Sequence, residues 1–342
     1  MKARLWMAVI MIAALISAPL SFAADEKIGI FEAIHVSTVS FDETTAAVEA
    51  AFATSGLVLH ATHDVRVPED KHRARVYVLT SPAYADAAKD ESARTISAQI
   101  LRLAVYTSGD EQQTYINMAN PVAHAMVFYA NSTNYDALLT AARGVSDEIR
   151  QLVAAVPGEA VAEQQEPVRK EKHYKKFKGD GPARMMAKFR TFEKSQLLIT
   201  EDSVENFDTV VGNVKMALAN STVSGIDDST GWEQVAAIKL RDDAVYIGVT
   251  NPYIEDKMVR INSRFRSEGK SDGSPYPGVD HVAALPTDIL VIKEGGQTLV
   301  LHYGQMWRMQ LYFWDSGYRA FTANVGVPSA IANSIEVTLE AQ

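Results

Sequence analysis

The chain has 342 residues, 47% of them apolar, with 33 lysines and arginines, 42 aspartates and glutamates, and no cysteine. This length suggests two domains of about 150 residues each, and the apolar content suffices for packed cores. The missing cysteine excludes disulfide scaffolds, thiolate metal sites, iron–sulfur clusters and cysteine nucleophiles. The net charge of −9 argues against nucleic acid as a partner, because neutralising phosphates requires a basic surface.

The N-terminus, residues 1–23, has the pattern of a secretory signal peptide. Lys2 and Arg4 precede an uncharged apolar run from Leu5 to Leu20, and the small residues Ser21 and Ala23 mark a cleavage site. An uncleaved membrane anchor is the alternative, but the run is shorter than the roughly 20 residues that a bilayer span requires. We therefore predict a periplasmic protein that is cleaved after Ala23 and has no membrane span in its mature form.

Internal similarity is the strongest sign of organisation along the chain. Five segments of the first half recur in the same order in the second half, and together they indicate a tandem duplication. The matched pairs are Phe41–Ser55 with Phe207–Ser221, Tyr77–Pro82 with Tyr246–Pro252, Ala104–Gly109 with Val291–Gly295, Gln113–Ile116 with Gln297–Val300, and Ala125–Tyr129 with Met309–Phe313.

Each half shows the same plan of helices and short strands. Ser40 and Glu43 form a capping box, which predicts a helix that begins at Phe41. A closing amphipathic helix is predicted over Ala137–Val156. Between these helices, β-branched and aromatic runs predict strands and glycine-containing turns predict hairpins. Helices that flank a hairpin-connected sheet indicate the α+β class. The strand runs are Val76–Leu79, Leu103–Tyr106 and Tyr115–Ile116, and the turns are Ser108–Asp110 and Glu294–Gly296.

These patterns predict three units after the signal peptide: a first α+β repeat at 24–157, a charged linker at 158–195 and a second α+β repeat at 196–342. The linker contains the basic run Arg169–Lys178, which holds six basic residues and one acid. This run could dock an acidic partner or an anionic membrane surface. We favour a solvated linker, because runs of like charge usually face solvent.

Both halves resemble the family known as domain of unknown function 302. The resemblance implies a compact α+β sandwich and brings no established activity. The first half departs from the family pattern, because no proline follows Leu101. The motifs that carry the resemblance are the strand-ending steps Ser81–Pro82 and Asn251–Pro252, and the step Leu285–Pro286 before the strand Ile289–Ile292, with Tyr303 at the end of the hairpin.

A metal site is the first candidate for chemistry. His60, His63 and Asp64, with His72 nearby, offer imidazole and carboxylate ligands for zinc or copper(II). Residues three apart in a strand point to opposite faces, so only a turn or helix would bring His60 and His63 together. We therefore favour packing or surface histidines over a divalent metal, and predict no cofactor.

A ligand platform is the second candidate, because aromatic residues crowd one stretch of the second half, from Trp307 to Phe321. If this stretch is a strand, alternation places Tyr312 and Trp314 on one face and Phe313 on the other. An outward face would serve a ligand or a second copy of the chain. A covered face would be core, which is the more usual place for aromatic side chains.

No serine-nucleophile elbow or zinc-hydrolase motif occurs, so the sequence offers no catalytic signature. We predict a non-enzymatic periplasmic binding or accessory protein for an unknown small molecule or protein. A metal-assisted hydrolase or metal-binding protein built on His60 and His63 is the alternative. A homo-oligomer formed through exposed sheet edges or the aromatic face is a third prediction. The predicted ligand contacts are Asn251, Tyr253, Trp307, Tyr312 and Trp314.

Overall fold

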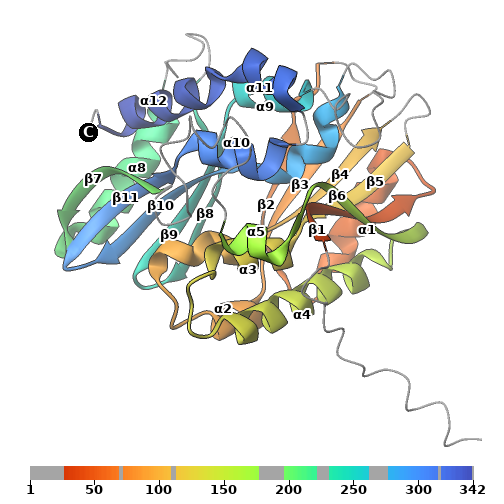
Figure 1. Cartoon of the computed structure of the whole chain (residues 1–342), viewed down its shortest axis with the longest axis horizontal. Coiled ribbons are helices and arrows are strands. Elements are labelled where there is room, and N and C mark those ends of the chain that lie inside the picture. Colours follow the sequence, from red (N-terminus) through yellow and green to blue (C-terminus); the bar gives the residue numbers. More distant parts are fainter. Residues whose placement is uncertain are drawn as a thin grey trace, which may run out of the picture.

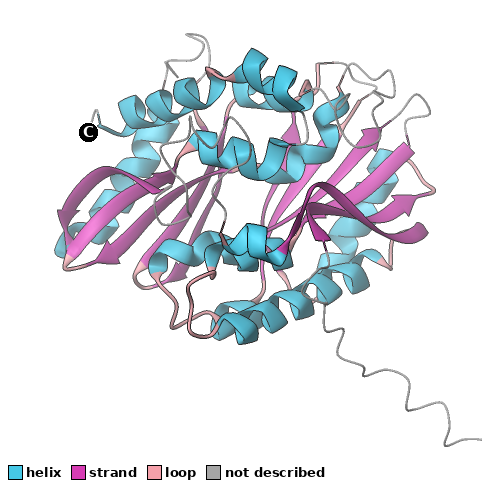
Figure 2. Ribbon diagram, viewed as in Figure 1, coloured by secondary structure: helices cyan, strands magenta, loops and turns pink. Residues whose placement is uncertain are grey.

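The computed structural model describes residues 27–68, 72–108, 113–176, 196–221, 231–261, 276–314 and 317–340. The predicted signal peptide, the turn residues Gly109 and Asp110 and the end of the basic run lie outside these ranges. Two sheets lie side by side, with α10, α11 and α12 along one side of the pair and α2 and α4 along the other (Figures 1 and 2). Among the described helices, none has the length and apolarity needed to cross a bilayer.

The first repeat contains a six-stranded antiparallel sheet in the order β2-β3-β4-β5-β1-β6. Short 3₁₀ helices are labelled η. The elements in chain order are β1 (Lys27–Ser37), α1 (Phe41–Phe52), β2 (Val58–Val65), β3 (Ala74–Thr80), α2 (Pro82–Ala87), η1 (Ala93–Gln99), β4 (Leu101–Ser108), β5 (Gln113–Ala119), α3 (Pro121–Phe128), α4 (Tyr135–Val153), β6 (Gly158–Lys170) and α5 (Glu171–Lys175).

The second repeat contains a five-stranded antiparallel sheet in the order β7-β11-β10-β9-β8. Its elements are β7 (Gln196–Ser203), η2 (Val204–Asn206), α8 (Phe207–Asn220), β8 (Glu233–Arg241), β9 (Ala244–Thr250), α9 (Pro252–Val259), η3 (Pro277–Ala284), β10 (Thr287–Glu294), β11 (Gln297–Tyr303), α10 (Gln305–Phe313), α11 (Gly317–Asn324) and α12 (Val327–Glu340).

The two sheets have the same topology, which agrees with the predicted α+β duplication. Strands β2-β3-β4-β5-β1 of the first repeat correspond one by one to β8-β9-β10-β11-β7 of the second. Even a local irregularity recurs: the β1–β5 register shifts between Ala33 and His35, and the β7–β11 register shifts between Val300 and Leu301. Ile116 and Val300, which border these shifts, are equivalent in the sequence match. A shared bulge at one position makes independent origins of the two sheets a poor explanation.

Local sequence explains where several elements begin and turn. Ser40 and Glu43 form the predicted capping box at the start of α1. Ser81 and Asn251 cap α2 and α9 by accepting from the backbone N–H three residues on, and each is followed by a proline at the first helical position. The hairpin turn predicted at Glu294–Gly296 is present: Gly295 and Gly296 form a two-residue loop between β10 and β11, with φ angles of +60° and +81° that glycine adopts at low cost.

The predicted linker is corrected over its first half. Gly158–Lys170 forms β6, which pairs with β1 along its whole length, and α5 follows directly. The described part of the basic run is folded: Arg169 is buried and donates to the backbone oxygens of Gln310 and Leu311. The run of like charges predicted a solvated segment here. The prediction fails because the edge of β1 supplies backbone hydrogen-bond partners to this segment.

The strand geometry considered for the aromatic stretch of the second half is also corrected. Met309–Phe313 lies in helix α10, just as the matching Ala125–Phe128 lies in α3. The expected alternation of faces over Tyr312, Phe313 and Trp314 therefore does not hold, because a helix repeats every 3.6 residues.

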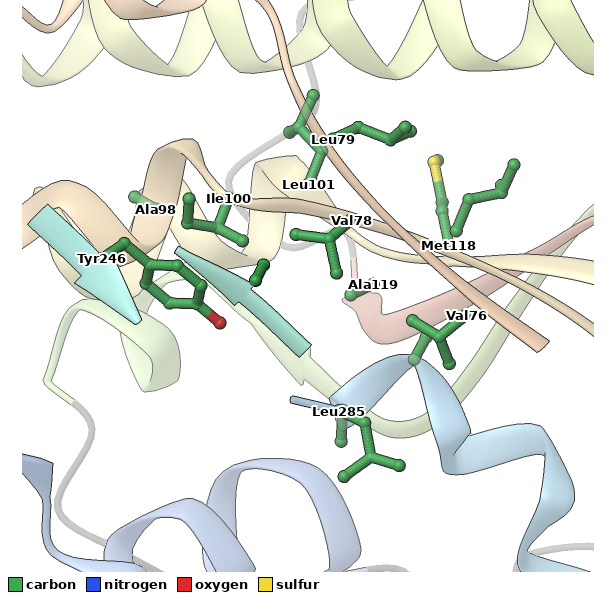
Figure 3. Close-up of a cluster of buried hydrophobic side chains, with 14 of the residues drawn as sticks. Val76, Val78, Leu79, Ala98, Ile100, Leu101, Met118, Ala119, Tyr246 and Leu285 are labelled. Carbon is green, nitrogen blue, oxygen red and sulfur yellow. The ribbon is translucent and has the colours of Figure 1, made fainter. Parts of the chain in front are cut away.

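The repeats share one core, because each sends a 3₁₀ helix onto the sheet of the other. η3 of the second repeat packs on β3, β4 and β5, and η1 of the first repeat packs on β9 and β10. The edge strands β2 and β8 also lie beside each other. Figure 3 shows the result: Val76, Val78 and Met118 of the first sheet surround the same apolar space as Tyr246 and Leu285 of the second repeat.

Candidate functional site

The most polar part of the core lies where the two repeats meet. Arg102 on β4 donates to Asp288 on β10 over 2.5 Å, and neither residue is more than 2% exposed. Tyr246 donates to the same carboxylate oxygen at 2.9 Å, and the hydroxyl of Tyr312 lies 3.3 Å from the guanidinium. Arg102 and Asp288 are the second residues of equivalent strands. A buried ion pair between equivalent strands of the two repeats therefore joins the two sheets.

The imidazole of His124 on α3 packs beside this pair. Its Nε2 atom lies 2.9 Å from the hydroxyl of Tyr312. Burial lowers the pKa of His124 to about 3, and the positive charges of Arg102 and Arg308 act in the same direction. His124 is therefore neutral at physiological pH and serves there as a hydrogen-bonding core residue.

A pocket opens beside this network, between α9, α10 and the α11–α12 pair. Its cavity volume is about 70 Å³ and its walls are mainly apolar. Lys257 stands exposed among the lining residues, with its Nζ atom 5.2 Å from the centre of the Tyr253 ring. The apolar lining consists of Ile254, Met258, Ile261, Met309, Phe313, Val327, Pro328 and Ile331, and the polar lining consists of Lys257, Gln305, Arg308 and Asn324.

Arg308 is the buried charge in this pocket. It is 8% exposed, and its guanidinium donates to the hydroxyl of Thr287 at 2.9 Å and to the backbone oxygen of Ala284 at 2.8 Å. Its Nε atom is buried and has no acceptor among the described residues. No carboxylate of the described residues forms an ion pair with Arg308. A buried guanidinium held only by neutral acceptors leaves its positive charge available to an anion.

Two of the predicted ligand contacts come from α9 and do not line the pocket. Asn251 is fully buried and caps the helix by accepting from the backbone N–H of Ile254 at 2.9 Å. Tyr253 is half-buried, and its ring lies under Lys257. The Asn251–Tyr253 segment thus starts the helix whose next turns form one pocket wall, so the sequence identified the helix but not its lining face.

The three predicted aromatic contacts differ in burial: two are buried within α10, and the third is half-buried at its end. Trp307 and Tyr312 are each 2% exposed, so they are core. Trp314 is half-buried and packs edge-on against Phe321 at 6.0 Å between ring centres. None of the three lines the pocket. The predicted aromatic platform therefore does not form one surface: Trp307 and Tyr312 are core residues, and Trp314 is half-buried at the end of α10.

The predicted metal ligands point to separate partners. His60 lies 2.8 Å from the hydroxyl of Thr80, and Asp64 is paired with Arg75 at 2.6 Å. His72 is buried, with its ring edge-on to Tyr276 at 5.3 Å. In the part of the chain that the structure describes, no group of three or more histidines and acids could hold a metal ion.

The remaining predicted ligand, His63, joins the two repeats. Its Nε2 atom lies 2.7 Å from Oε1 of Glu255, which is fully buried on α9. Arg66 adds its backbone N–H at 2.8 Å and its guanidinium at 3.3 Å to the other oxygen. Burial alone would raise the pKa of Glu255, but the hydrogen bond and charge of His63 and the contacts of Arg66 outweigh it and hold the pKa below 4.5.

We expect the Glu255 cluster to make folding acid-sensitive in a defined direction. Because the folded-state pKa is lowered, its stabilisation is complete above the ordinary value of 4.5 and is lost as the pH falls through the folded value. Glu255→Gln should therefore unfold more easily than the parent chain at pH 7, by roughly 1–3 kcal/mol, with the gap closing toward pH 3. Urea denaturation at both pH values measures this, with the exposed Glu163→Gln as control. A gap that stays constant with pH would contradict the assignment.

Sequence reasoning missed Gln305 and Arg308, the two buried polar residues that line the pocket. A helical reading of 305–313 would have found them, because positions 305, 308, 309 and 313 fall on one face at steps of three and four. The available signal was an arginine beside a glutamine on a face that also carries Met309 and Phe313. Comparisons of the chain with family models, with curated proteins and with solved structures found no match.

Proposed function

We propose that this chain is an exported, non-enzymatic binding protein that holds a small apolar anion in the pocket between α9, α10 and α12. The observation that carries the proposal is the buried guanidinium of Arg308, whose Nε atom lacks an acceptor among the described residues. The export signal and the absence of a catalytic motif in the sequence support the wider assignment. The resemblance to the domain of unknown function 302 family is compatible with it and adds no activity.

The chemistry of the pocket favours a ligand with two unlike ends. Apolar side chains of Met258, Phe313 and Ile331 suit a hydrocarbon or a ring. Arg308 offers a buried donor in the lining, and Lys257 adds a cation at an exposed position. A carboxylate attached to a short apolar body meets both requirements, because charge-assisted hydrogen bonds to a desolvated guanidinium are strong.

The same lining favours binding over hydrolysis. Among the described residues, those that line the pocket include no histidine, aspartate or glutamate, which are the usual general acids and bases near neutral pH. A histidine can act as an acid or base near neutral pH, but burial in the core keeps the nearby His124 neutral.

Calorimetric titration of the mature chain with hexanoate, hexanol and hexylammonium tests the proposal. We expect hexanoate to bind at least about tenfold more tightly than hexanol, since one charge-assisted hydrogen bond is worth roughly 1.5–3 kcal/mol. Arg308→Gln should remove this preference, and Lys257→Gln should weaken it severalfold without affecting folding, because Lys257 is exposed. Lys89→Gln, which removes a charge from an exposed ion pair, is the control. Equal binding of hexanol and hexanoate would overturn the proposal.

A further inference from the structure

The first strands of the two repeats are equivalent in topology but differ in exposure. Strand β1 is almost wholly buried, whereas none of the eight residues of β7 is buried. Both strands pair with the last strand of their hairpin, β5 or β11, through the same bulge. The difference in exposure therefore comes from what lies on the other side of each strand.

In the first repeat that other side is occupied by β6. Strand β6 runs antiparallel to β1 from Gly158, opposite Ser37, to Lys170, opposite Lys27. In the second repeat β7 is the end of the sheet, and no described strand pairs with its outer side. Strand β6 thus shows, within the same chain, that the edge equivalent to β7 accepts a long antiparallel strand.

The other edge strands carry features that hinder the addition of a further strand, and β7 lacks these features. Strands β2 and β8 lie beside each other, joined by the ion pair between Arg66 and Glu233. Strand β6 carries Pro167, which cannot donate to a further strand. Strand β7 has no proline, and its Leu198 is 52% exposed. An edge of this kind is a template for strand addition.

Exposed apolar side chains gather around the same edge. Five large apolar residues are exposed among those described, and three of them, Leu198, Met216 and Val337, belong to β7, α8 and α12. These three elements contact one another at the outer end of the second repeat. A strand added to β7 would bring its own side chains against this apolar group.

The charge around the edge decides what could bind there. The described residues of β7, η2, α8 and α12 include one basic residue, Lys215, and six acids. A second copy of the chain would bring the same acidic edge against this one, which is unfavourable. The six acids are Glu201, Asp202, Glu205, Asp208, Glu336 and Glu340.

We propose that β7 is a docking edge for an extended segment of a partner protein in which basic and apolar residues alternate. The segment adds antiparallel to β7, as β6 adds to β1. Its apolar side chains cover Leu198, and its basic side chains lie on the opposite face of the sheet, beside Asp202. This surface is separate from the ligand pocket, so the two proposals can fail independently.

The probe for this edge is a fluorescent nine-residue peptide in which lysine and valine alternate. Fluorescence anisotropy with the mature chain should show saturable binding that weakens with salt. Hydrogen exchange should show new protection within Gln196–Ser203. The charge-reversed variant Glu201→Lys/Asp202→Lys should weaken binding by about tenfold. It should gain affinity for a peptide of alternating glutamate and valine.

Two controls separate strand addition from simple charge attraction. The variant Glu159→Lys/Glu163→Lys reverses two exposed acids on β6 and should leave binding unchanged. A lysine–proline peptide carries the same charge but cannot form a ladder, so it should bind weakly. The proposal is overturned if that peptide binds as tightly as the lysine–valine peptide or if protection appears only outside β7. It is equally overturned if sedimentation shows a dimer of the chain alone with β7 protected.

Discussion

Replacing Asp288 by alanine should lower the free energy of unfolding by about 3–5 kcal/mol, the largest effect expected for a single charge in this chain. The substitution leaves the guanidinium of Arg102 buried without an anion, because both partners are at most 2% exposed. Tyr246 also loses the acceptor of its hydroxyl. Urea denaturation monitored by tryptophan fluorescence measures the loss.

A double substitution distinguishes the cost of a broken pair from the value of the pair itself. Arg102→Met with Asp288→Leu removes both charges and fills the space with apolar atoms, so it should recover most of the lost stability. Asp86→Ala breaks the exposed pair with Lys89 and should change stability by less than about 1 kcal/mol. If Asp288→Ala cost no more than Asp86→Ala, the ion pair would not join the repeats.

Replacing Trp307 by alanine should cost about 3–5 kcal/mol of stability, as large-to-small changes of buried aromatic residues do. Trp307 is 2% exposed, its ring stacks on Tyr303 at 5.7 Å, and its edge contacts Phe128 of the first repeat at 6.1 Å. The substitution therefore opens a cavity in the core that the two repeats share. Thermal and chemical denaturation both report this loss.

Trp314→Ala is the matched control for this substitution. Trp314 is half-buried at the end of the same helix, so its removal should cost clearly less. The comparison also tests the predicted aromatic platform. If Trp307→Ala left stability intact and reduced ligand binding instead, Trp307 would be a contact residue and its assignment to the core would be wrong.

Much of the fold could be predicted from the sequence because its signals are local. The capping box at Ser40, the glycine pair at Gly295 and the closing helix after Asn134 each depend on residues a few positions apart. The duplication was visible because equivalent positions kept similar residues in one order. The linker prediction failed because the partner of β6 is β1, about 130 positions away, and a charge run carries no information about a distant open edge.

The pocket and the joint between the repeats could not be predicted in the same way. Arg308 and Met258 approach only after α9 and α10 pack together. His63 was considered as a metal ligand, but its partner Glu255 lies 192 positions further along the chain. The helical face of α10 was hidden because an aromatic run such as 312–314 fits a strand as well as a helix when it is short.

The sequence by itself determined the α+β class, the duplication and the local starts of helices and turns, because these depend on periodicity and on neighbouring residues. Only the tertiary structure decided which side of each element is buried. It paired Arg102 with Asp288 at the joint, left Arg308 without a carboxylate among the described residues, and covered β1 while leaving β7 exposed. Burial and electrostatic pairing arise between residues far apart in the chain, and so they appear only once the two sheets have packed.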